Sequence, residues 1–337
     1  MSDIERAKII ARTLAGRGLL VRTKSCVLYF AKVKQWLMTG NLGAIVYGRP
    51  RLGKTSATRW VIRVLPEKFG NIPFIEVPIR KQHLQNEGAF FQFLLKCCRA
   101  KYFNKGSVAD KRDRFGEALL MRARRSSTRT VIVFIDEAQT LEVLQYEWLQ
   151  NISNELDAIG YRVFFLLVGQ HELDERRKTL ILEGHEQIVA RFMTEALSFS
   201  GLTSVEQLKD ALRGYDEGMF PEPKGKIVQD SKAFLAWFIP KAFGRGFRLE
   251  NEGARLWSGY QNVWIELGID DVLELPMHYV TSTVTNLLSL LSEIDSDNLI
   301  VDDKLIVNSI KASGFKNSVA ILMEGRKKIK KSQLIVN

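Results

Sequence analysis

The stretch Val46–Val61, VYGRPRLGKTSATRWV, decides the fold. It satisfies the spacing G-x-x-x-x-G-K-[ST], follows a short apolar run and precedes a helical pattern, as a phosphate-binding loop does. In such a loop the glycines let the backbone amides turn toward phosphates, and the next helix directs its N-terminus at their charge. Lys54 would reach the outer phosphates, and the Thr55 hydroxyl would bind Mg2+. We therefore predict that ATP and Mg2+ are bound here, with nucleotide contacts from Gly48, Arg49, Pro50, Arg51, Leu52, Gly53, Lys54, Thr55 and Ser56.

A second motif, VIVFIDEAQ, occupies residues 131–139. Its apolar residues place Asp136 and Glu137 at the end of a buried strand, where ligands bind in open α/β sheets. We expect Asp136 to bind Mg2+, directly or through water, and Glu137 to act as the base that polarises the attacking water. A later strand ends at Gln170, which would orient that water or sense the outer phosphate; the alternative is a polar cap of the strand. These residues predict ATP hydrolysis, or at least ATP binding.

Apolar runs and helical patterns alternate along the first 200 residues. The runs at 42–48, 73–79, 130–136 and 162–169 have the composition of buried strands. Amphipathic helices accompany them: one apolar face is predicted from Val27, Phe30, Val33, Trp36 and Leu37, and another from Leu141, Leu144, Trp148, Ile152 and Leu156. The alternation predicts an α/β fold in which helices flank a central parallel sheet.

The pattern changes at about residue 201, where helical periodicity continues without strands and a Pro/Gly loop interrupts it at 221–225. We expect four parts: an N-terminal helical segment (1–40), an α/β nucleotide-binding core (41–200), a small helical lid subdomain with its extension (201–303) and a basic tail (304–337). Residues 263–303 hold nine acids and no Lys or Arg. The loop 214–232 and the tail are given no role.

Charge is distributed unevenly along the chain, whose formal net charge is +11. Residues 1–64 hold 13 Lys/Arg and two acids, and residues 65–130 hold 14 Lys/Arg and six acids, which gives +19 for the front part. The remaining 207 residues therefore carry −8. A polyanion such as nucleic acid is the simplest partner for so basic a segment; solvated helix faces without a specific role are the alternative.

Several classes of protein are disfavoured by composition. The three cysteines, Cys26, Cys97 and Cys98, have neither the number nor the spacing of a disulfide framework or a zinc site, so we expect reduced core thiols. The apolar runs are shorter than the roughly 20 residues of a membrane span, and the N-terminus lacks the apolar segment of a signal peptide. We expect a protein of the prokaryotic cytoplasm that has no membrane partner.

Three arginines are candidates for contacts with the outer phosphates. Arg191, in the stretch HEQIVARF, would stabilise charge on a nucleotide held by a neighbouring subunit, which requires a homo-oligomer. In the stretch FGRGFRLENEGARLW, Arg245 and Arg248 lie at a predicted helix entrance of the lid subdomain. Either one would reach back to the nucleotide, or would simply be a surface residue.

These elements, in this order, resemble those of AAA+ P-loop ATPases. More closely, the chain resembles the TnsC/TniB group of transposition regulators, which includes IstB- and MuB-like proteins. The resemblance runs from about Val33 to Trp257 and rests on VKQWLMTG, GRPRLGKT, NKGSVADKRDRFGEAL, VIVFIDEAQTL, VGQHELD and HEQIVARF followed by LSFSGL. The string KGSVADKRDR carries most of it, because the phosphate motifs alone would fit any AAA+ protein.

The resemblance implies ATP-dependent assembly into rings or helical filaments on double-stranded DNA. It further implies that the assembly marks a target site, meets a target-selection protein and recruits a DDE transposase. The K-G-[ST] stretch of the group contacts one DNA strand and corresponds here to Lys105 and Ser107. Phosphate contacts by Lys and Arg suit binding without sequence preference. Further candidates are Lys111, Arg112 and Arg114, and a weaker set is Arg122, Arg124 and Arg125, for which a solvated helix face is the alternative.

The chain departs from the pattern of the group at two places. Many members have Thr or Asn where this chain has Gln170, which affects how the attacking water is oriented. The lid arginine of the group often follows G-R-L, whereas GRGFRLE leaves two candidates, of which FRLE favours Arg248. Two other functions fit the motifs: a different AAA+ ATPase, such as a helicase or clamp loader, and an ATP-gated DNA-binding scaffold in which turnover is incidental.

Overall fold

The computed structural model describes residues 19–79, 86–220 and 232–321. The chain divides into two compact units, one formed by Ser25–Phe199 and the other by Met1–Lys24 together with Ser200–Asn337. We describe each unit by itself. The predictions for residues 1–18, for most of the 214–232 loop and for the end of the basic tail (322–337) lie outside the described residues.

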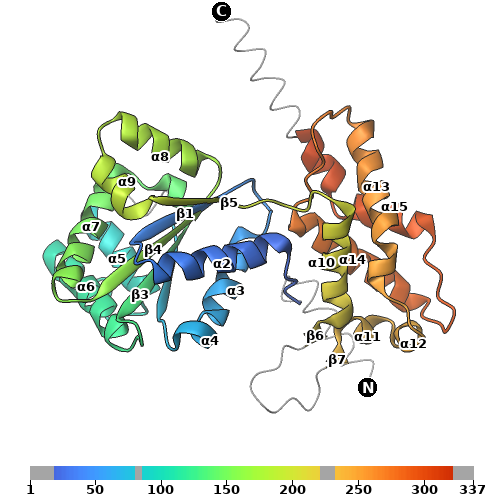
Figure 1. Cartoon of the computed structure of the whole chain (residues 1–337), viewed down its shortest axis with the longest axis horizontal. Helices are drawn as coiled ribbons and strands as arrows, with labels where there is room; N and C mark the ends of the chain where they lie inside the picture. The colour runs from blue at the N-terminus through green and yellow to red at the C-terminus, as the bar shows by residue number, and fades with distance from the viewer. Residues whose placement is uncertain (1–18, 80–85, 221–231, 322–337) are drawn as a thin grey trace, which may run out of the picture. The chain divides into compact units, whose positions relative to one another are not determined.

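A five-stranded parallel sheet forms the centre of the Ser25–Phe199 unit (Figure 1). Its strands are β1 (Gly43–Tyr47), β2 (Phe74–Pro78), β3 (Thr130–Asp136), β4 (Arg162–Gly169) and β5 (Glu195–Ser198), in the order β2-β3-β4-β1-β5. The central β3 and β4 are almost completely buried, as expected for parallel strands covered on both faces. The sequence indicated four of these strands and missed β5, because Glu195 and Ser198 interrupt its short apolar pattern.

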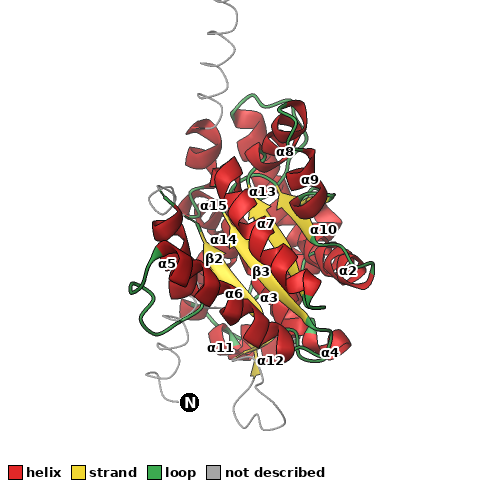
Figure 2. Cartoon of the chain, turned by 90° about the vertical axis from the view of Figure 1, so that its left-hand side faces the viewer, coloured by secondary structure: helices red, strands yellow, loops and turns green. Residues whose placement is uncertain are grey.

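Helices cover the sheet. They are α2 (Lys24–Met38), α3 (Lys54–Val64), α4 (Pro66–Phe69), α5 (Glu87–Cys97), α6 (Val108–Arg124), the 3-10 turn η3 (Ala138–Thr140), α7 (Val143–Ala158), α8 (Glu172–Leu182) and α9 (Glu186–Phe192). Helices α5, α6 and α7 contact β2, β3 and β4, respectively, while α8 and α9 contact β1 and β4. Figure 2 shows β2 and β3 as yellow strands among the surrounding helices. The predicted α/β fold, a parallel sheet flanked by helices, is confirmed.

Two helices bury most of the predicted face, including Val33, Trp36 and Leu37 of α2 and Ile152 and Leu156 of α7, but each differs from it at one position. In α2, Val27 is 54% exposed, while Tyr29 is completely buried and its hydroxyl pairs with the Thr58 hydroxyl at 2.8 Å. In α7, Leu144 is 54% exposed, and Tyr146 lies in the core instead. In both helices an aliphatic residue predicted for the core is exposed, and a tyrosine that was not predicted is buried.

The other unit is helical, as expected for the region after residue 201. It contains α10 (Val205–Glu217), α11 (Phe234–Phe238), α12 (Pro240–Gly244), η4 (Leu249–Glu252), α13 (Gly253–Glu266), α14 (Met277–Glu293) and α15 (Asp303–Ala312), with the two short strands β6 (Met219–Phe220) and β7 (Lys232–Ala233). These helices enclose a hydrophobic core of their own. Across the described ranges, every helix is too short or too polar to cross a membrane.

Several acids of residues 263–303 have partners within this unit. Asp297 pairs with Arg245 at 2.8 Å, Asp303 with Arg255 at 2.5 Å, and Glu266 with Lys316 at 2.6 Å. The Asp295 carboxylate accepts hydrogen bonds from the backbone N–H groups of Lys241 and Ala242 at the start of α12. These four of the nine acids therefore serve the internal structure of the unit.

Candidate functional site

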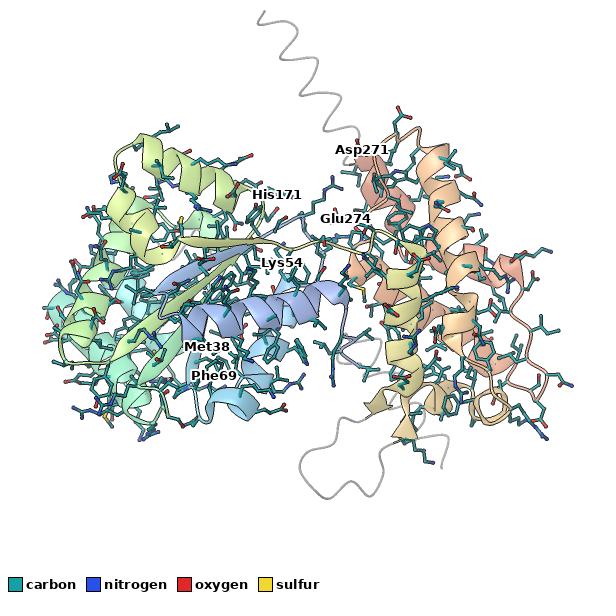
Figure 3. The ribbon with its side chains drawn as sticks, viewed as in Figure 1. Met38, Lys54, Phe69, His171, Asp271 and Glu274 are labelled. Atoms are coloured by element: carbon teal, nitrogen blue, oxygen red, sulfur yellow. The ribbon has the colours of Figure 1, made fainter. Side chains whose placement is uncertain are left out.

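The register of the sheet brings three strand ends to one edge. Tyr47 of β1 lies beside Gly169 of β4, and Asp136 of β3 lies beside Val168. The phosphate loop, the DE pair and Gln170 follow directly after these strands, so they share the carboxyl edge where open α/β sheets bind ligands. At this edge the Tyr47 and His171 rings are in contact, and Figure 3 shows Lys54 and His171 at the same end of the sheet.

The phosphate loop is held by backbone geometry that the motif residues allow. Gly53, just before α3, has φ of 99°, and Arg51 takes φ of 66°, in the left-handed region. Gly48 is required for a different reason: a Cβ there would lie 2.3 Å from the Phe199 carbonyl oxygen. The sequence explained Gly48 only through loop curvature, whereas the structure adds the close approach of the segment after β5.

Lys54 begins α3 and is only 9% exposed. Its Nζ donates to the carbonyl oxygens of Gly48 and Arg49, at 2.8 Å each. Burial lowers the pKa of Lys54, while the nearby carboxylates of Glu137, Asp136 and Glu172 act in the opposite direction. A desolvated ammonium interacts more strongly with phosphate oxygens than one in water does.

The side chains of Thr55, in the first turn of α3, and Asp136, at the end of β3, are in contact. The Thr55 hydroxyl donates to Asp136 Oδ2 at 2.9 Å. Burial raises the pKa of Asp136, the bond from Thr55 lowers it, and the charge of Glu137 raises it again. A hydroxyl and a carboxylate are hard oxygen ligands that fit Mg2+. The described residues contain no group of three His, Cys, Asp or Glu that would hold a metal by themselves, so the ion would need oxygens of the nucleotide as well.

Glu137 follows Asp136 in a left-handed conformation with φ of 57°, which is strained for a residue with a side chain. Gln139 Nε2 donates to Glu137 Oε2 at 2.6 Å, and Gln170 Nε2 lies 3.5 Å from the same oxygen. The structure therefore brings the predicted base and the predicted water-orienting residue together.

Gln139 was not predicted. Its Oε1 accepts from the backbone N–H of Gln170 at 3.3 Å, so its amide links the loop after β3 to the end of β4. A Cβ on Gly169 would lie 2.3 Å from this oxygen, so glycine at 169 makes room for the amide. The sequence signal was the DEAQ string itself, in which Gln139 is the only amide next to the acids.

Arg191 lies at the opposite end of the strands, where β1 begins. Its backbone carbonyl approaches Gly43, the first residue of β1, so closely that a Cβ on Gly43 would lie 2.6 Å from it. Five residues of strand separate Gly43 from the loop, about 16 Å at the usual rise. Arg191 Nη1 donates to Ser153 Oγ at 2.8 Å. Arg191 is therefore hydrogen-bonded within its own chain and its backbone lies far from its own phosphate loop; its action in trans stays a prediction.

The two lid arginines have partners within their own unit. Arg245 is exposed and forms the ion pair with Asp297. Arg248 Nη1 donates to the carbonyl oxygens of Phe243 and Phe247, and its guanidinium lies 4.3 Å from the centre of the Phe243 ring. The choice of Arg248 as the lid arginine stays a prediction.

The candidate DNA-binding residues surround the N-terminus of α6. Ser107 caps this helix: its hydroxyl accepts from Asp110 N–H, and its own N–H donates to Asp110 Oδ2 at 2.8 Å. Lys105 is exposed, with Nζ 5.1 Å from the centre of the Tyr102 ring. Lys111 donates to Gln92 at 3.5 Å.

The arginines of this region differ in how far their side chains are engaged in contacts within the chain. Arg112 pairs with Glu87 at 3.3 Å. Arg114 donates to the carbonyl oxygens of Asp110, Tyr102 and Lys105, which gives it a structural role. In the weaker set, Arg122 donates to the carbonyl oxygens of Cys98 and Ala118, whereas Arg124 and Arg125 are exposed.

The cysteines are free thiols. Burial raises the pKa of Cys97 to about 12 and that of Cys98 to about 11, so neither is a reactive thiolate at neutral pH.

Comparison with known proteins found one matching family profile and several solved structures of similar fold. The family profile of the AAA domain (AAA_22) matches residues 38–176. The solved structure of the Aeropyrum pernix ORC2 protein, in ADPNP–ADP complexes, is 12% identical with a TM-score of 0.54, covering 86% of this chain and 67% of that one. The Cdc6p structure from Pyrobaculum aerophilum is 15% identical over 88% of this chain and 81% of that one, with a TM-score of 0.45.

A third structure, the Aeropyrum pernix ORC1 protein in complex with DNA, is 17% identical over 87% of this chain and 77% of that one, with a TM-score of 0.41. No curated protein matches the chain. The AAA domain and the site at the strand ends support an ATPase of the AAA+ class. Membership of the TnsC/TniB group stays a prediction.

Proposed function

We propose that the chain is an ATP-dependent regulator of transposition that oligomerises on double-stranded DNA. In this proposal the ATP-bound assembly marks a target site and recruits or activates a DDE transposase. It also interacts with a target-selection protein. ATP hydrolysis then takes the assembly apart. One observation supports it above the others: an ATPase site and an exposed basic loop occur in the same compact unit.

The residues at the carboxyl edge have complementary roles in this function. Lys54 binds the outer phosphates, and Thr55 and Asp136 supply oxygen ligands for Mg2+. When bound, Mg2+ neutralises charge on the phosphate oxygens. Glu137, oriented by Gln139 and Gln170, accepts a proton from the attacking water.

Oligomerisation gives Arg191 a role. At the amino edge of the sheet it is remote from its own nucleotide, so its guanidinium would stabilise charge on the nucleotide of a neighbouring subunit. ATP hydrolysis then depends on assembly of the subunits. Because the subunits assemble on DNA, DNA binding would regulate ATP turnover.

A loader of helicases or clamps is the second candidate, because the AAA domain and the fold shared with the ORC2 protein suit that class equally well. The two differ in what the assembly encloses. A transposition regulator requires duplex DNA to assemble, whereas a loader closes a ring and acts on a protein partner.

Electron microscopy of negatively stained protein distinguishes them. We expect rings or filaments when the purified full chain is mixed with duplex DNA and a non-hydrolysable ATP analogue, and none when either is omitted. With ATP instead of the analogue, the assemblies of the wild type should disappear as nucleotide is consumed.

Glu137→Gln is the matched variant, because it keeps the shape of the side chain and removes the base. Its assemblies should persist in ATP. Closed rings that form without DNA would exclude the proposal and favour a loader, and wild-type assemblies that outlast ATP consumption would exclude hydrolysis-driven disassembly.

A further inference from the structure

The loop between α5 and α6, residues 99–107, exposes an aromatic ring and contains three basic residues, Arg99, Lys101 and Lys105. Residues 88–109 contain four Lys/Arg and no acid. Tyr102 is 66% exposed. Lys105 Nζ lies 5.1 Å from the centre of this ring, so a cation and an aromatic surface stand side by side.

The backbone of the loop is strained. Arg99 and Tyr102 both have φ of 55°, and Gly106 has φ of 90°. A positive φ is rare for a bulky residue, and strained backbone of this kind is concentrated at ligand-binding sites. Gly106 is also sterically required, because a Cβ there would lie 2.9 Å from the Asp110 side chain.

Arg114 holds the loop in this conformation. From the first turns of α6, its guanidinium donates to the Tyr102 carbonyl at 3.0 Å and also to the Lys105 carbonyl. Its Nε donates to the carbonyl of Asp110 at 3.1 Å. All three acceptors are backbone atoms, so Arg114 fixes where the ring and the ammonium are presented.

We propose that the 99–107 loop is a preformed binding element for one strand of duplex DNA, in which the Tyr102 ring packs on a deoxyribose and Lys105 pairs with the adjacent phosphate. Sugar and phosphate alternate along a strand, which matches an apolar ring beside an ammonium. Arg114 is a positioning residue that does not contact DNA. The inference rests on the proposed DNA-binding function and adds Tyr102 to its contact residues.

The contributions of ring and charge separate in a salt titration. A phosphate contact adds about one unit to the slope of log affinity against log salt, whereas packing of a ring does not change the slope. We expect Tyr102→Ala to weaken duplex binding about tenfold at every salt concentration, with the slope unchanged. Tyr102→Phe should bind like the wild type, and Lys105→Ala should lose about one unit of slope.

The measurement is fluorescence anisotropy of a labelled duplex with the full chain and a non-hydrolysable ATP analogue. Leu182→Ala, at a residue of the same unit that is 89% exposed, is the control for loss of an apolar surface side chain. Arg114→Lys keeps the charge but not the planar fork, so it should weaken binding. The double variant Arg114→Ala/Lys105→Ala should have the same slope as Lys105→Ala alone; a still lower slope would show a direct phosphate contact of Arg114 and overturn the positioning role.

Failure of the loop proposal is distinct from failure of the proposed function. If the wild type binds the duplex and Tyr102→Ala binds equally well, the loop proposal is wrong and the function stands. If the wild type does not bind duplex DNA in the presence of the nucleotide, both are wrong. A single-stranded probe bound more tightly than the duplex, with the same loss in Tyr102→Ala, would show base stacking and overturn the duplex assignment.

Discussion

Glu137 shows how one residue can depend on neighbours distant in sequence. Its backbone is left-handed, and its carboxylate is bound by the amide of Gln139 and lies near that of Gln170. A carboxylate on a strained, exposed turn would otherwise sample several directions, only some of which face an attacking water. The amide of Gln139 therefore limits the orientation of the base, and glycine at 169 leaves space for it.

Replacing Gln139 by Ala should lower kcat for ATP hydrolysis about tenfold and leave ATP affinity nearly unchanged. The loss is smaller than the 10²–10⁴ contributed by a general base, because Glu137 remains and only its orientation is lost. Steady-state ATPase kinetics and equilibrium binding of a fluorescent ATP analogue measure the two quantities.

Gln187→Ala, at an exposed position of α9, serves as the control for removal of a glutamine. Gly169→Ala offers an independent route to the same effect, because its Cβ would displace the Gln139 amide. Weaker ATP affinity with normal kcat in Gln139→Ala would contradict the orienting role.

At the scale of an element, the N-terminus of α6 shows that a predicted ligand contact can also be a helix cap. The resemblance assigned Ser107 to DNA, and the structure gives it a reciprocal pair of hydrogen bonds with Asp110. These bonds hold the pKa of the Asp110 carboxyl below its usual range, chiefly through the Ser107 backbone N–H. Any change at Ser107 therefore alters the helix as well as the surface.

Ser107→Ala should lower the free energy of unfolding by about 1 kcal/mol, the usual cost of losing such a cap. Ser107→Asn should restore most of it, because asparagine caps helices as well as serine does. Denaturant unfolding of the full chain, followed at the unit that contains α6, measures both. If DNA affinity falls in Ser107→Ala and recovers in Ser107→Asn, the cap and not the hydroxyl carries the effect; loss of affinity in both would support a direct contact.

At the scale of the whole molecule, the basic and acidic parts of the sequence do not coincide with the two compact units. Within the Ser25–Phe199 unit, residues 25–130 hold 21 Lys/Arg and six acids, whereas residues 131–199 hold five and twelve. Of the described residues of the basic front, 19–24 group with the helical unit instead. The excess positive charge of the nucleotide-binding unit is thus contributed by its first half, which includes the phosphate loop and the 99–107 loop.

The proposed role of Arg191 predicts that ATP hydrolysis requires an assembly of subunits. We expect Arg191→Ala to lower ATP turnover more than ATP binding. Mixing it with Lys54→Ala should give more activity than the sum of the two alone, because the Lys54→Ala subunit supplies Arg191 to an intact neighbouring site. An ATPase assay over a range of mixing ratios, with duplex DNA present, provides the measurement.

Ser153→Ala removes the hydrogen bond that Arg191 makes within its own chain and leaves the arginine in place. Ser153→Ala should retain ATP turnover. This result would exclude that Arg191→Ala lowers turnover only through loss of this hydrogen bond. If the mixtures give only the sum of their components, the arginine does not act in trans.

The sequence by itself determined the chemistry that short segments encode. The loop Gly48–Thr55, the acids Asp136 and Glu137, and four of the strands follow from local spacing and apolar runs, which need no distant partner to be recognised. The fold class followed from their alternation. The ends of these strands also indicated which residues share one edge.

Tertiary structure alone decided what depends on neighbours far along the chain. It placed β4 between β3 and β1, added β5 at the edge and buried tyrosines of α2 and α7 that were not predicted for the core. It tied Glu137 to Gln139 and Gln170, and gave Arg114 and Ser107 structural roles. The physical reason is that a hydrogen bond or a close approach belongs to a pair of residues, and residue types and local spacing do not show which distant residue will complete it.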